Sequence, residues 1–192
     1  SKGHKSDIKK AKKLGLVVSD NISVSDWRLF GQILKKMYKV RNLEINESEL
    51  DHHLRNLYDL VTNSQLAKCF FVRDSLGTFI GGIVVVFQGN TVRYYKGAAD
   101  PERRVFPILH LAIWEAIIQA KTKGYDFFDF WGYNHFVDDT DQVFQINRFK
   151  KGFGGKFVFF PKIMYCIFKP IYLDVINILG KIIAMKARWT KT

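Results

Sequence analysis

Two segments in the second half of the chain hold the residue types that anion binding or acyl transfer needs. The stretch Arg148–Gly155, Arg-Phe-Lys-Lys-Gly-Phe-Gly-Gly, places three cations, two aromatic rings and three glycines within eight residues. Cations beside flexible backbone suit an anionic group, or the oxyanion that forms during acyl transfer. The same stretch also fits a simpler interpretation, in which Phe149 is buried and Gly152 caps a helix before a strand begins. From these residues alone both interpretations stay open.

The segment Tyr125–Gly132, Tyr-Asp-Phe-Phe-Asp-Phe-Trp-Gly, has the alternation of a strand. Phe127 and Asp129 point to one side of it, and Phe128 and Phe130 point to the other. A polar loop follows, and then a short helix that ends in the basic stretch. The two segments together are therefore the best candidate for a functional site.

Other catalytic or metal-binding patterns are weak in this sequence. It has no Walker loop, and Gly152-x-Gly154 alone is a poor phosphate signal. The adjacent His52 and His53 would face different directions on a helix, His110 lies inside a predicted helix, and His4 and His135 are isolated. No Cys-His or Ser-His spacing indicates a nucleophile. We therefore expect no metal site.

Composition predicts one globular domain with an anionic partner. The chain has 192 residues, is 47% apolar, and contains 17 Phe and 8 Tyr, which is enough for a single aromatic-rich core. Its net charge of +12 favours nucleic acid, a phosphorylated substrate or acidic lipid, unless the surplus is only a solvated basic surface. Cys69 and Cys166 lie in apolar runs, which favours buried free thiols over a disulfide. The chain has no initial Met, so we expect a piece of a longer protein.

The periodicity of apolar residues predicts helices and strands in an α+β order. Helices are expected at Ser6–Gly15, Ser25–Val40, Glu49–Thr62, Phe106–Lys123 and Val143–Lys150, and strands at Ala67–Arg73, Phe79–Phe87, Thr91–Lys96, Asp126–Trp131 and Lys156–Phe160. This order resembles the GNAT fold of the acyl-CoA N-acyltransferases. The resemblance implies a mixed sheet flanked by helices.

One loop departs from the usual GNAT pattern. Acetyl-CoA-dependent members carry a Gln/Arg-x-x-Gly-x-Gly/Ala loop before the long helix, and its backbone amides hold the pyrophosphate. The corresponding stretch here, Gly97–Arg104, lacks those glycines, and Asp100 and Glu102 would repel a pyrophosphate. The sequence therefore argues against coenzyme A, and we expect no cofactor.

The two functional segments also resemble a more specific family. Arg148–Gly155, following Tyr125–Gly132, is similar to the closing region of Fem-type (FemAB-like) peptidyltransferases, which build the interpeptide bridge of bacterial peptidoglycan from aminoacyl-tRNA. Ile8–Gly15 is similar to the inter-domain helix of that family, Tyr94–Ala99 to its aromatic strand end, and Leu111–Ala120 to its long helix. These matches occur in the family's order along most of the chain before the C-terminal tail.

The resemblance implies a domain organisation and a site. It makes the chain the second GNAT-like domain of such an enzyme, without the N-terminal one, and divides it into a basic inter-domain-type helix (1–15), a GNAT-like domain (16–162) and an apolar, basic helical tail (163–192). Phe149 and Lys150 match the Phe-Lys pair near the acyl-transfer site. Lys150 would stabilise the negative charge of the tetrahedral intermediate, and Phe149 would exclude water.

The resemblance also implies the substrates. Tyr95, Arg41, Arg148 and Lys151 are the expected substrate-binding residues. The expected partners are aminoacyl-tRNA and a muropeptide precursor linked to a nucleotide or a lipid, and such anionic partners suit the +12 charge of the chain. The expected location is the cytoplasm, with contact to the inner face of the bacterial membrane as an option for the tail.

Two points stay open. The tail has no run near the ~20 apolar residues of a bilayer span, so its amphipathic helix after Pro170 either packs into a neighbouring domain or lies in a membrane interface. The function also has two alternatives to aminoacyl transfer. One is a GNAT-like N-acyltransferase that acts on a cell-surface sugar or amine, and the other is a non-catalytic module that binds tRNA or a protein partner.

Overall fold

The structure is a computed structural model of the chain, and it describes residues 2–134, 137–138, 140–159 and 178. The chain splits into two compact units, Ser1–Gly155 and Lys156–Thr192. The first unit contains the N-terminal helix together with the sheet, and everything below concerns this unit. The predicted boundary at residue 162, the tail helix after Pro170 and Cys166 all lie outside the described residues.

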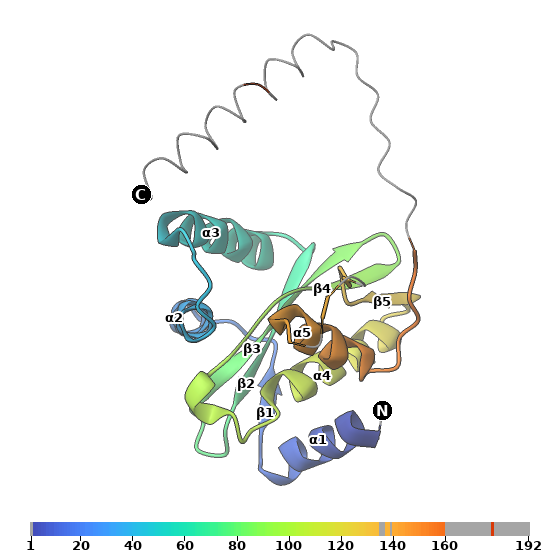
Figure 1. Cartoon of the computed structure of the whole chain (residues 1–192). Helices are drawn as coiled ribbons and strands as arrows, with labels where there is room; N and C mark the ends of the chain where they lie inside the picture. The colour runs from blue at the N-terminus through green and yellow to red at the C-terminus, as the bar shows by residue number, and fades with distance from the viewer. Residues whose placement is uncertain (1, 135–136, 139, 160–177, 179–192) are drawn as a thin grey trace. The chain divides into compact units, whose positions relative to one another are not determined.

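A five-stranded mixed sheet forms the centre of the first unit (Figure 1). Its strands are β1 (Val17–Ser19), β2 (Ala67–Arg73), β3 (Phe79–Gln88), β4 (Thr91–Ala99) and β5 (Phe127–Asp129), and they lie in this order. The first four pair antiparallel, whereas β5 pairs parallel to β4 through only three residues of each strand. The predicted α+β architecture with a mixed sheet is confirmed.

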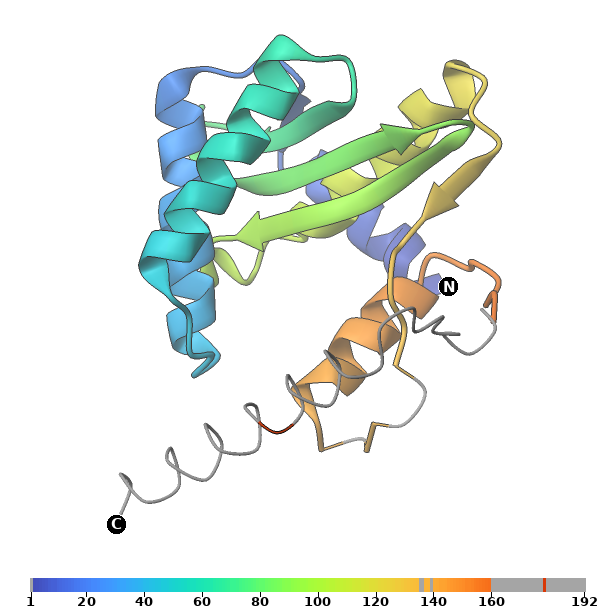
Figure 2. The ribbon, with the colours of Figure 1, turned by 90° about the horizontal axis from the view of Figure 1, so that it is seen from above.

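Helices cover both faces of this sheet. They are α1 (Lys2–Lys13), α2 (Val24–Val40), α3 (Glu47–Asn63), the short 3-10 helix η1 (Pro101–Arg103), α4 (Ile108–Thr122) and α5 (Gln142–Lys151). Figures 1 and 2 show α2 and α3 on one face, and α1 and α4 on the other. One buried cluster joins the sheet to α1 and α4, and a second joins it to α2 and α3. Because both faces are covered, most of β3 is a continuous buried apolar run.

Helix ends follow the capping chemistry of the sequence, with one correction. Ser23, Asn46 and Asp141 each accept backbone N–H bonds at the start of α2, α3 and α5. The helix α1 already begins at Lys2, so Ser6, where the sequence pattern predicted its start, lies inside it. Gly15 does end α1, at a φ of +71°, where glycine has no steric penalty.

Two strand predictions differ from the structure. The short edge strand β1 was not predicted, because three residues are too few to show an alternation. Conversely, residues 156–159 form no strand, although the aromatic run predicted one there, and residue 160 lies outside the described part. Apolar character alone therefore does not make a strand, because β propensity depends on the surroundings.

A bulge in β4 sets which residues face the functional side. Val85 pairs with Tyr94, but Val84 pairs with Lys96, so Tyr95 is the extra residue. Before and after it, Tyr94 and Ala99 pack against the α1–α4 cluster, while Tyr95 packs against the α2–α3 cluster. The two adjacent tyrosines serve opposite faces by ordinary alternation, and the bulge shifts the alternation after them, so that Ala99 and not Ala98 shares the side of Tyr94.

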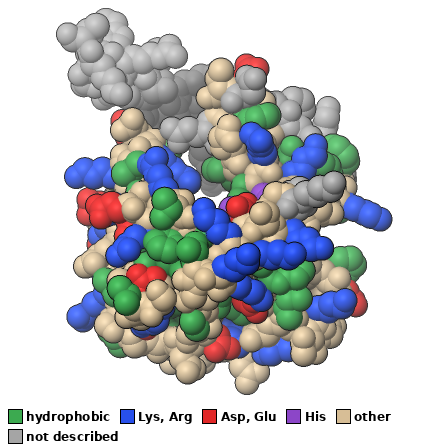
Figure 3. Space-filling view, turned by 90° about the horizontal axis from the view of Figure 1, so that it is seen from below, with side chains coloured by type: hydrophobic (Ala, Val, Ile, Leu, Met, Phe, Trp, Pro, Cys, Tyr) green, Lys and Arg blue, Asp and Glu red, His purple; other side chains and the backbone are tan. Residues whose placement is uncertain are grey.

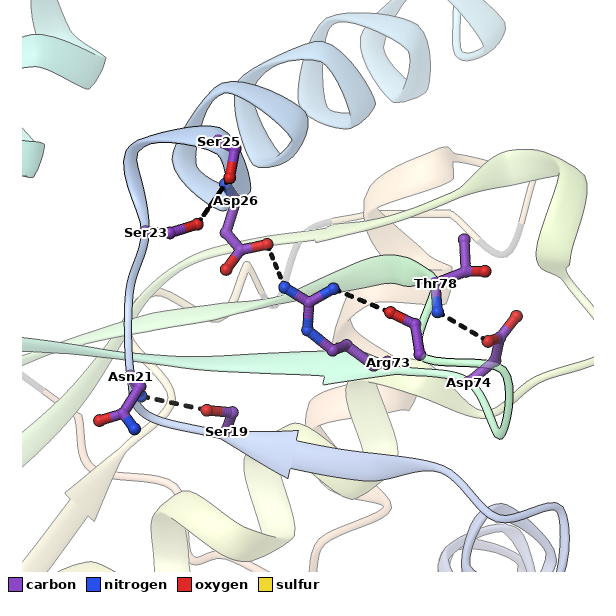
Figure 4. A network of polar contacts seen from close by, with 9 residues as sticks. Ser19, Asn21, Ser23, Ser25, Asp26, Arg73, Asp74 and Thr78 are labelled. Atoms are coloured by element: carbon purple, nitrogen blue, oxygen red, sulfur yellow. Dashed lines mark hydrogen bonds and ion pairs between the residues drawn. The ribbon is translucent and has the colours of Figure 1, made fainter.

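A network of paired polar groups holds the hairpin between β2 and β3 to the start of α2 (Figure 4). Arg73 forms an ion pair with the buried Asp26 and donates a second bond to the carbonyl of Gly77, at 2.9 Å. Asp74 accepts N–H bonds from Leu76 at 3.0 Å and from Thr78 at 2.9 Å. Each of these buried carboxylates thus has a partner, which is the condition for burying charge.

Candidate active site

A cleft of about 720 Å³ lies at the N-terminal end of α4. The end of α2, the bulged strand β4, the connection through η1 and the helix α5 form its walls. It is therefore bounded by segments from the whole length of the first unit. Three of the predicted site residues, Arg41, Phe149 and Lys150, line it.

Electrostatics make this cleft suited to an anion. Its basic lining residues are Lys10, Arg41, Arg103, Arg104 and Lys150, against the acidic Asp7 and Asp100. The N-cap residue of α4, Pro107, supplies no side-chain bond to the first helical N–H groups, and the positive end of the helix dipole lies at the cleft. Figure 3 views the side on which α1 lies in Figure 1, and Lys and Arg predominate over Asp and Glu on that face.

Lys150 brings together the two segments that the sequence singled out. Its Nζ donates a hydrogen bond to the carbonyl of Gly132 at 2.7 Å. The side chain is half-buried, and this desolvation lowers the pKa of Lys150, while the nearby Asp129 opposes the shift. An ammonium has three N–H donors, and Gly132 takes one of them. Lys150 can therefore direct positive charge at the cleft while it is fixed to the backbone after β5.

Phe149 forms an aromatic wall beside Lys150. Its ring lies 4.9 Å from that of His110, 5.4 Å from that of Phe153 and 5.5 Å from that of His4, between centroids. Its carbonyl is bonded to Nε2 of His4, at 2.9 Å. The expectation that His4 is isolated was therefore wrong, because the fold returns α5 to the N-terminal helix. Phe149 also packs against the core, as the simpler interpretation of this stretch predicted.

Tyr94 is a cleft residue that the sequence did not indicate. Burial raises the pKa of its phenol to about 12, although the charge of Arg41 acts in the opposite direction. The phenol thus stays protonated at neutral pH and can act as a proton donor. Gly97 makes room for it, because a Cβ there would lie 2.2 Å from the Tyr94 hydroxyl oxygen. Gly97 lies on the side of Tyr94, three residues away, because of the bulge at Tyr95, and a bulge has no reliable sequence signal.

The other predicted site residues lie elsewhere. Tyr95 is on the opposite face of the sheet, where its hydroxyl lies 3.3 Å from Nε2 of His53 and its ring meets Trp131 edge to face. Arg148 and Lys151 are exposed on α5 and do not line the cleft. The roles of all six residues stay predictions, but only three of the six meet in one place.

Trp131 lies just after β5, between residues that serve the two faces of the sheet. It has a positive φ of 63°, which is unusual for a bulky residue, and its N–H donates to Asp129 Oδ1 at 2.7 Å. Asp129 Oδ2 also pairs with Arg93, whose guanidinium lies 4.7 Å from the centre of the Trp131 ring. The turn holds the Trp131 ring near Tyr95 and the next carbonyl, of Gly132, at Lys150.

The structure weakens one objection to coenzyme A. Lys36 of α2 pairs with Glu102 at 2.6 Å and with Asp100 at 3.5 Å. Asp100 also caps η1 by accepting the N–H of Glu102. The two acids are therefore partly neutralised, and Glu102 does not line the cleft. The repulsion expected between them and a pyrophosphate is reduced accordingly.

The family is decided by a sequence match. The family described as "Acetyltransferase (GNAT) domain" matches residues 2–150. The chain belongs to this family. Its curled mixed sheet with flanking helices is the GNAT fold, as the order of elements predicted, and the chain is a GNAT-type acetyltransferase domain. Enzymes of the family bind acyl-CoA.

Solved structures show the same fold at low identity. A crystal structure of FemX is 15% identical with a TM-score of 0.68 and is matched over 80% of this chain and 54% of that one, so this GNAT domain spans about half of FemX. A transcriptional regulator from Bacillus halodurans C-125 is 14% identical, with a TM-score of 0.57 and coverage of 79% and 99%. A possible acetyltransferase from Clostridium difficile 630 is 9% identical, with a TM-score of 0.53 and coverage of 80% and 99%. No curated protein sequence matches this domain.

Two general features of the GNAT domain complete this description. Cys69 is a buried free thiol, as predicted, and burial raises its pKa to about 12. Among the residues that the structure describes, no helix combines the length and the apolarity needed to cross a membrane.

Proposed function

We propose that this GNAT domain transfers an aminoacyl group from aminoacyl-tRNA to an amine of a peptidoglycan precursor peptide. In this reaction the amine attacks the ester carbonyl of the donor, the carbonyl oxygen becomes an oxyanion, and the tRNA ribose oxygen leaves. The family supplies acyl transfer as the class of chemistry. The donor and the acceptor come from the resemblance to Fem-type enzymes, with which the fold similarity to FemX agrees.

The observation that carries this proposal is the bond from Lys150 to the Gly132 carbonyl. It holds one cation, on a half-buried side chain, at the mouth of a cleft with a basic lining. A fixed cation in a partly desolvated place stabilises a developing oxyanion more strongly than a mobile surface lysine does. Tyr94, with its protonated phenol in the same cleft, is a suitable donor of the proton that the leaving oxygen needs.

The second candidate is acyl transfer from an acyl-CoA to a cell-surface sugar or amine. It is favoured by the family and by the position of the cleft at the N-terminus of α4, which suits a pyrophosphate. Pairing of Asp100 and Glu102 with Lys36 removes part of the electrostatic objection to this donor. The missing glycines of the loop before α4 remain the argument against it.

A comparison of donors tests the proposal. The protein that carries this domain is supplied in parallel with labelled aminoacyl-tRNA and with acetyl-CoA, each with a nucleotide-linked muropeptide as acceptor. Amino acid transfer from tRNA, lost in Lys150→Ala, is the expected result. Calorimetric titration of acetyl-CoA is the companion measurement, and we expect no saturable binding.

Two results would overturn the proposal in favour of an alternative, and a third would remove its mechanism. Tight acetyl-CoA binding with acetyl transfer to an amine would establish the second candidate. Binding of tRNA with a steep salt dependence but without turnover would establish a binding module. Undiminished transfer in Lys150→Ala would remove Lys150 from the mechanism, and with it the observation that carries the proposal.

A further inference from the structure

We propose that His4, Asp7 and His110 form a binding site for a divalent transition-metal ion of the zinc class, next to the cleft. This site is independent of the proposed reaction. It joins the N-terminal helix α1 to α4, and nothing in the acyl-transfer chemistry calls for it.

The geometry brings three ligands of suitable type together. His4 and Asp7 are three residues apart in α1, so their side chains share one face of that helix. His110 projects from the first turn of α4, and its Nε2 lies 3.5 Å from Asp7 Oδ2. One ligand atom from each residue lies within 4.8 Å of the other two. Tetrahedral bonds of zinc length require separations of about 3.3 Å, so small rotations of the side chains would close the site.

The surroundings of His4 match those of a metal ligand. Histidine ligands usually bond their second ring nitrogen to a carboxylate or a backbone carbonyl, which fixes the ring and its tautomer. Nε2 of His4 lies 2.9 Å from the Phe149 carbonyl, so coordination would use Nδ1. The His4 ring also packs directly on Gly152, where any Cβ would lie 2.1 Å from it. The absence of a side chain at Gly152 is thus required by the position of His4.

Aromatic rings enclose the group on one side. The ring of Phe153 lies 4.7 Å from that of His4, and the ring of Phe149 lies 4.9 Å from that of His110. The side chain of His110 is itself only 21% exposed, so the packing around it holds the imidazole in place. Asp7 is partly exposed and also lines the cleft, which leaves a path for the ion to enter.

The ligand types select the class of ion. Two imidazoles and one carboxylate suit Zn²⁺ and similar ions, whereas Mg²⁺ and Ca²⁺ prefer oxygen ligands throughout. A bound ion would connect α1, α4 and, through the Phe149 carbonyl, the end of α5. It would therefore fix the wall of the cleft that carries Phe149 and Lys150.

Titration of the metal-free chain with Zn²⁺ tests the site. The full chain, treated with a chelator, is titrated calorimetrically with Zn²⁺ and separately with Mg²⁺. We expect one Zn²⁺ per chain, no Mg²⁺ binding, and a higher melting temperature with Zn²⁺. Asp7→Asn and His110→Gln should each weaken Zn²⁺ binding by at least about tenfold.

Matched controls use histidines outside the group. His52→Asn and His53→Gln, both on α3, should keep the wild-type affinity. If a ligand variant fails to fold, the NMR chemical shifts of the histidine ring nitrogens in the wild type show instead which histidines bind Zn²⁺. Zn²⁺ must then shift His4 and His110 and leave His52 and His53 unchanged. No Zn²⁺ binding, or binding that ignores Asp7 and His110, overturns the proposal.

Discussion

Charge is used in opposite ways in two regions, the network around Arg73 and the Lys150 corner, by which we mean Lys150, its bonded Gly132 carbonyl and the adjoining cleft. At Arg73, each buried carboxylate has a cation or several N–H groups directed at it, and the group lies between the β2–β3 hairpin and the start of α2. At Lys150 the cation meets a neutral carbonyl, and basic side chains predominate in the cleft beside it. Breaking a buried, balanced pair destabilises the fold. An excess of one sign of charge instead causes repulsion between like charges, which a bound anion would reduce. The residues around Arg73 therefore hold the molecule together, whereas Lys150 and the basic residues of the cleft are available for chemistry.

The largest effect is expected from Lys150→Ala. If Lys150 stabilises the oxyanion as proposed, its loss should lower the transfer rate by roughly 10²- to 10³-fold, as removal of an oxyanion donor does in other enzymes. The melting temperature should change little, because the side chain is only half-buried and is bonded to one exposed backbone group. Initial rates and thermal unfolding of the same samples measure the rate loss and the melting temperature.

Lys123→Ala, at the exposed C-terminal end of α4, is the matched control. A comparable rate loss in that variant would mean that general basicity matters and not this corner.

The opposite pattern is expected from Arg73→Ala. It leaves Asp26 buried without its ion-pair partner, and Asp26 is only 10% exposed. We expect a loss of about 2–3 kcal/mol in the free energy of unfolding, less than for a fully buried pair, because Arg73 itself is 38% exposed. Urea unfolding measures this loss. Asp26→Asn should cost less, since the Arg73 guanidinium can then be hydrated. The rate per folded molecule should stay at the wild-type level in both, and equal losses of stability would contradict the argument from burial.

A smaller effect on rate is expected from Gly97→Ala. The added methyl would collide with the Tyr94 hydroxyl, so the phenol must leave its position. Displacing a proton donor by about an ångström lowers the rate by roughly tenfold or more. Tyr94→Phe should lower it to a similar degree. The double variant should be no slower than Tyr94→Phe alone, because both changes act through one hydroxyl. Additive losses would show that Gly97 acts through the backbone and not through Tyr94.

The fold could be predicted largely from local signals, and the site only in part. Strand β2 was predicted to the residue, and α2, α3 and α5 to within two residues, because their apolar periodicity and caps are local. Lys150 came from a resemblance, and its bond to Gly132 could not be predicted, since it depends on how the loop after β5 folds back. The contact of Tyr94 with Gly97 likewise depends on the bulge at Tyr95, which the sequence does not signal. The contact between His4 and His110 depends on the packing of α1 on α4, which no spacing in the sequence reveals.

The pH dependence of transfer gives the subtlest test of the Lys150 corner. Burial lowers the pKa of Lys150, so the cation is lost at a lower pH than for an ordinary lysine. The transfer rate should therefore be at its maximum below the lowered pKa and fall as pH rises through it. This fall should occur at a pH below 10.5, the ordinary pKa of lysine. Tyr94 cannot produce this fall, because its pKa is about 12. Lys150→Arg should remove the falling limb, since a guanidinium stays charged throughout this range.

Protein stability should move the other way over the same range of pH. The pKa of Lys150 is lower in the folded state than in the unfolded state, so between the two values the unfolded chain binds more protons. The contribution of this lysine to the free energy of unfolding therefore increases with pH there. Rates, corrected for spontaneous hydrolysis of the donor, are compared with urea unfolding at each pH in wild type and Lys150→Arg. If rate and stability fell together, and did so equally in both proteins, alkaline unfolding would explain the loss of activity and not the deprotonation of Lys150.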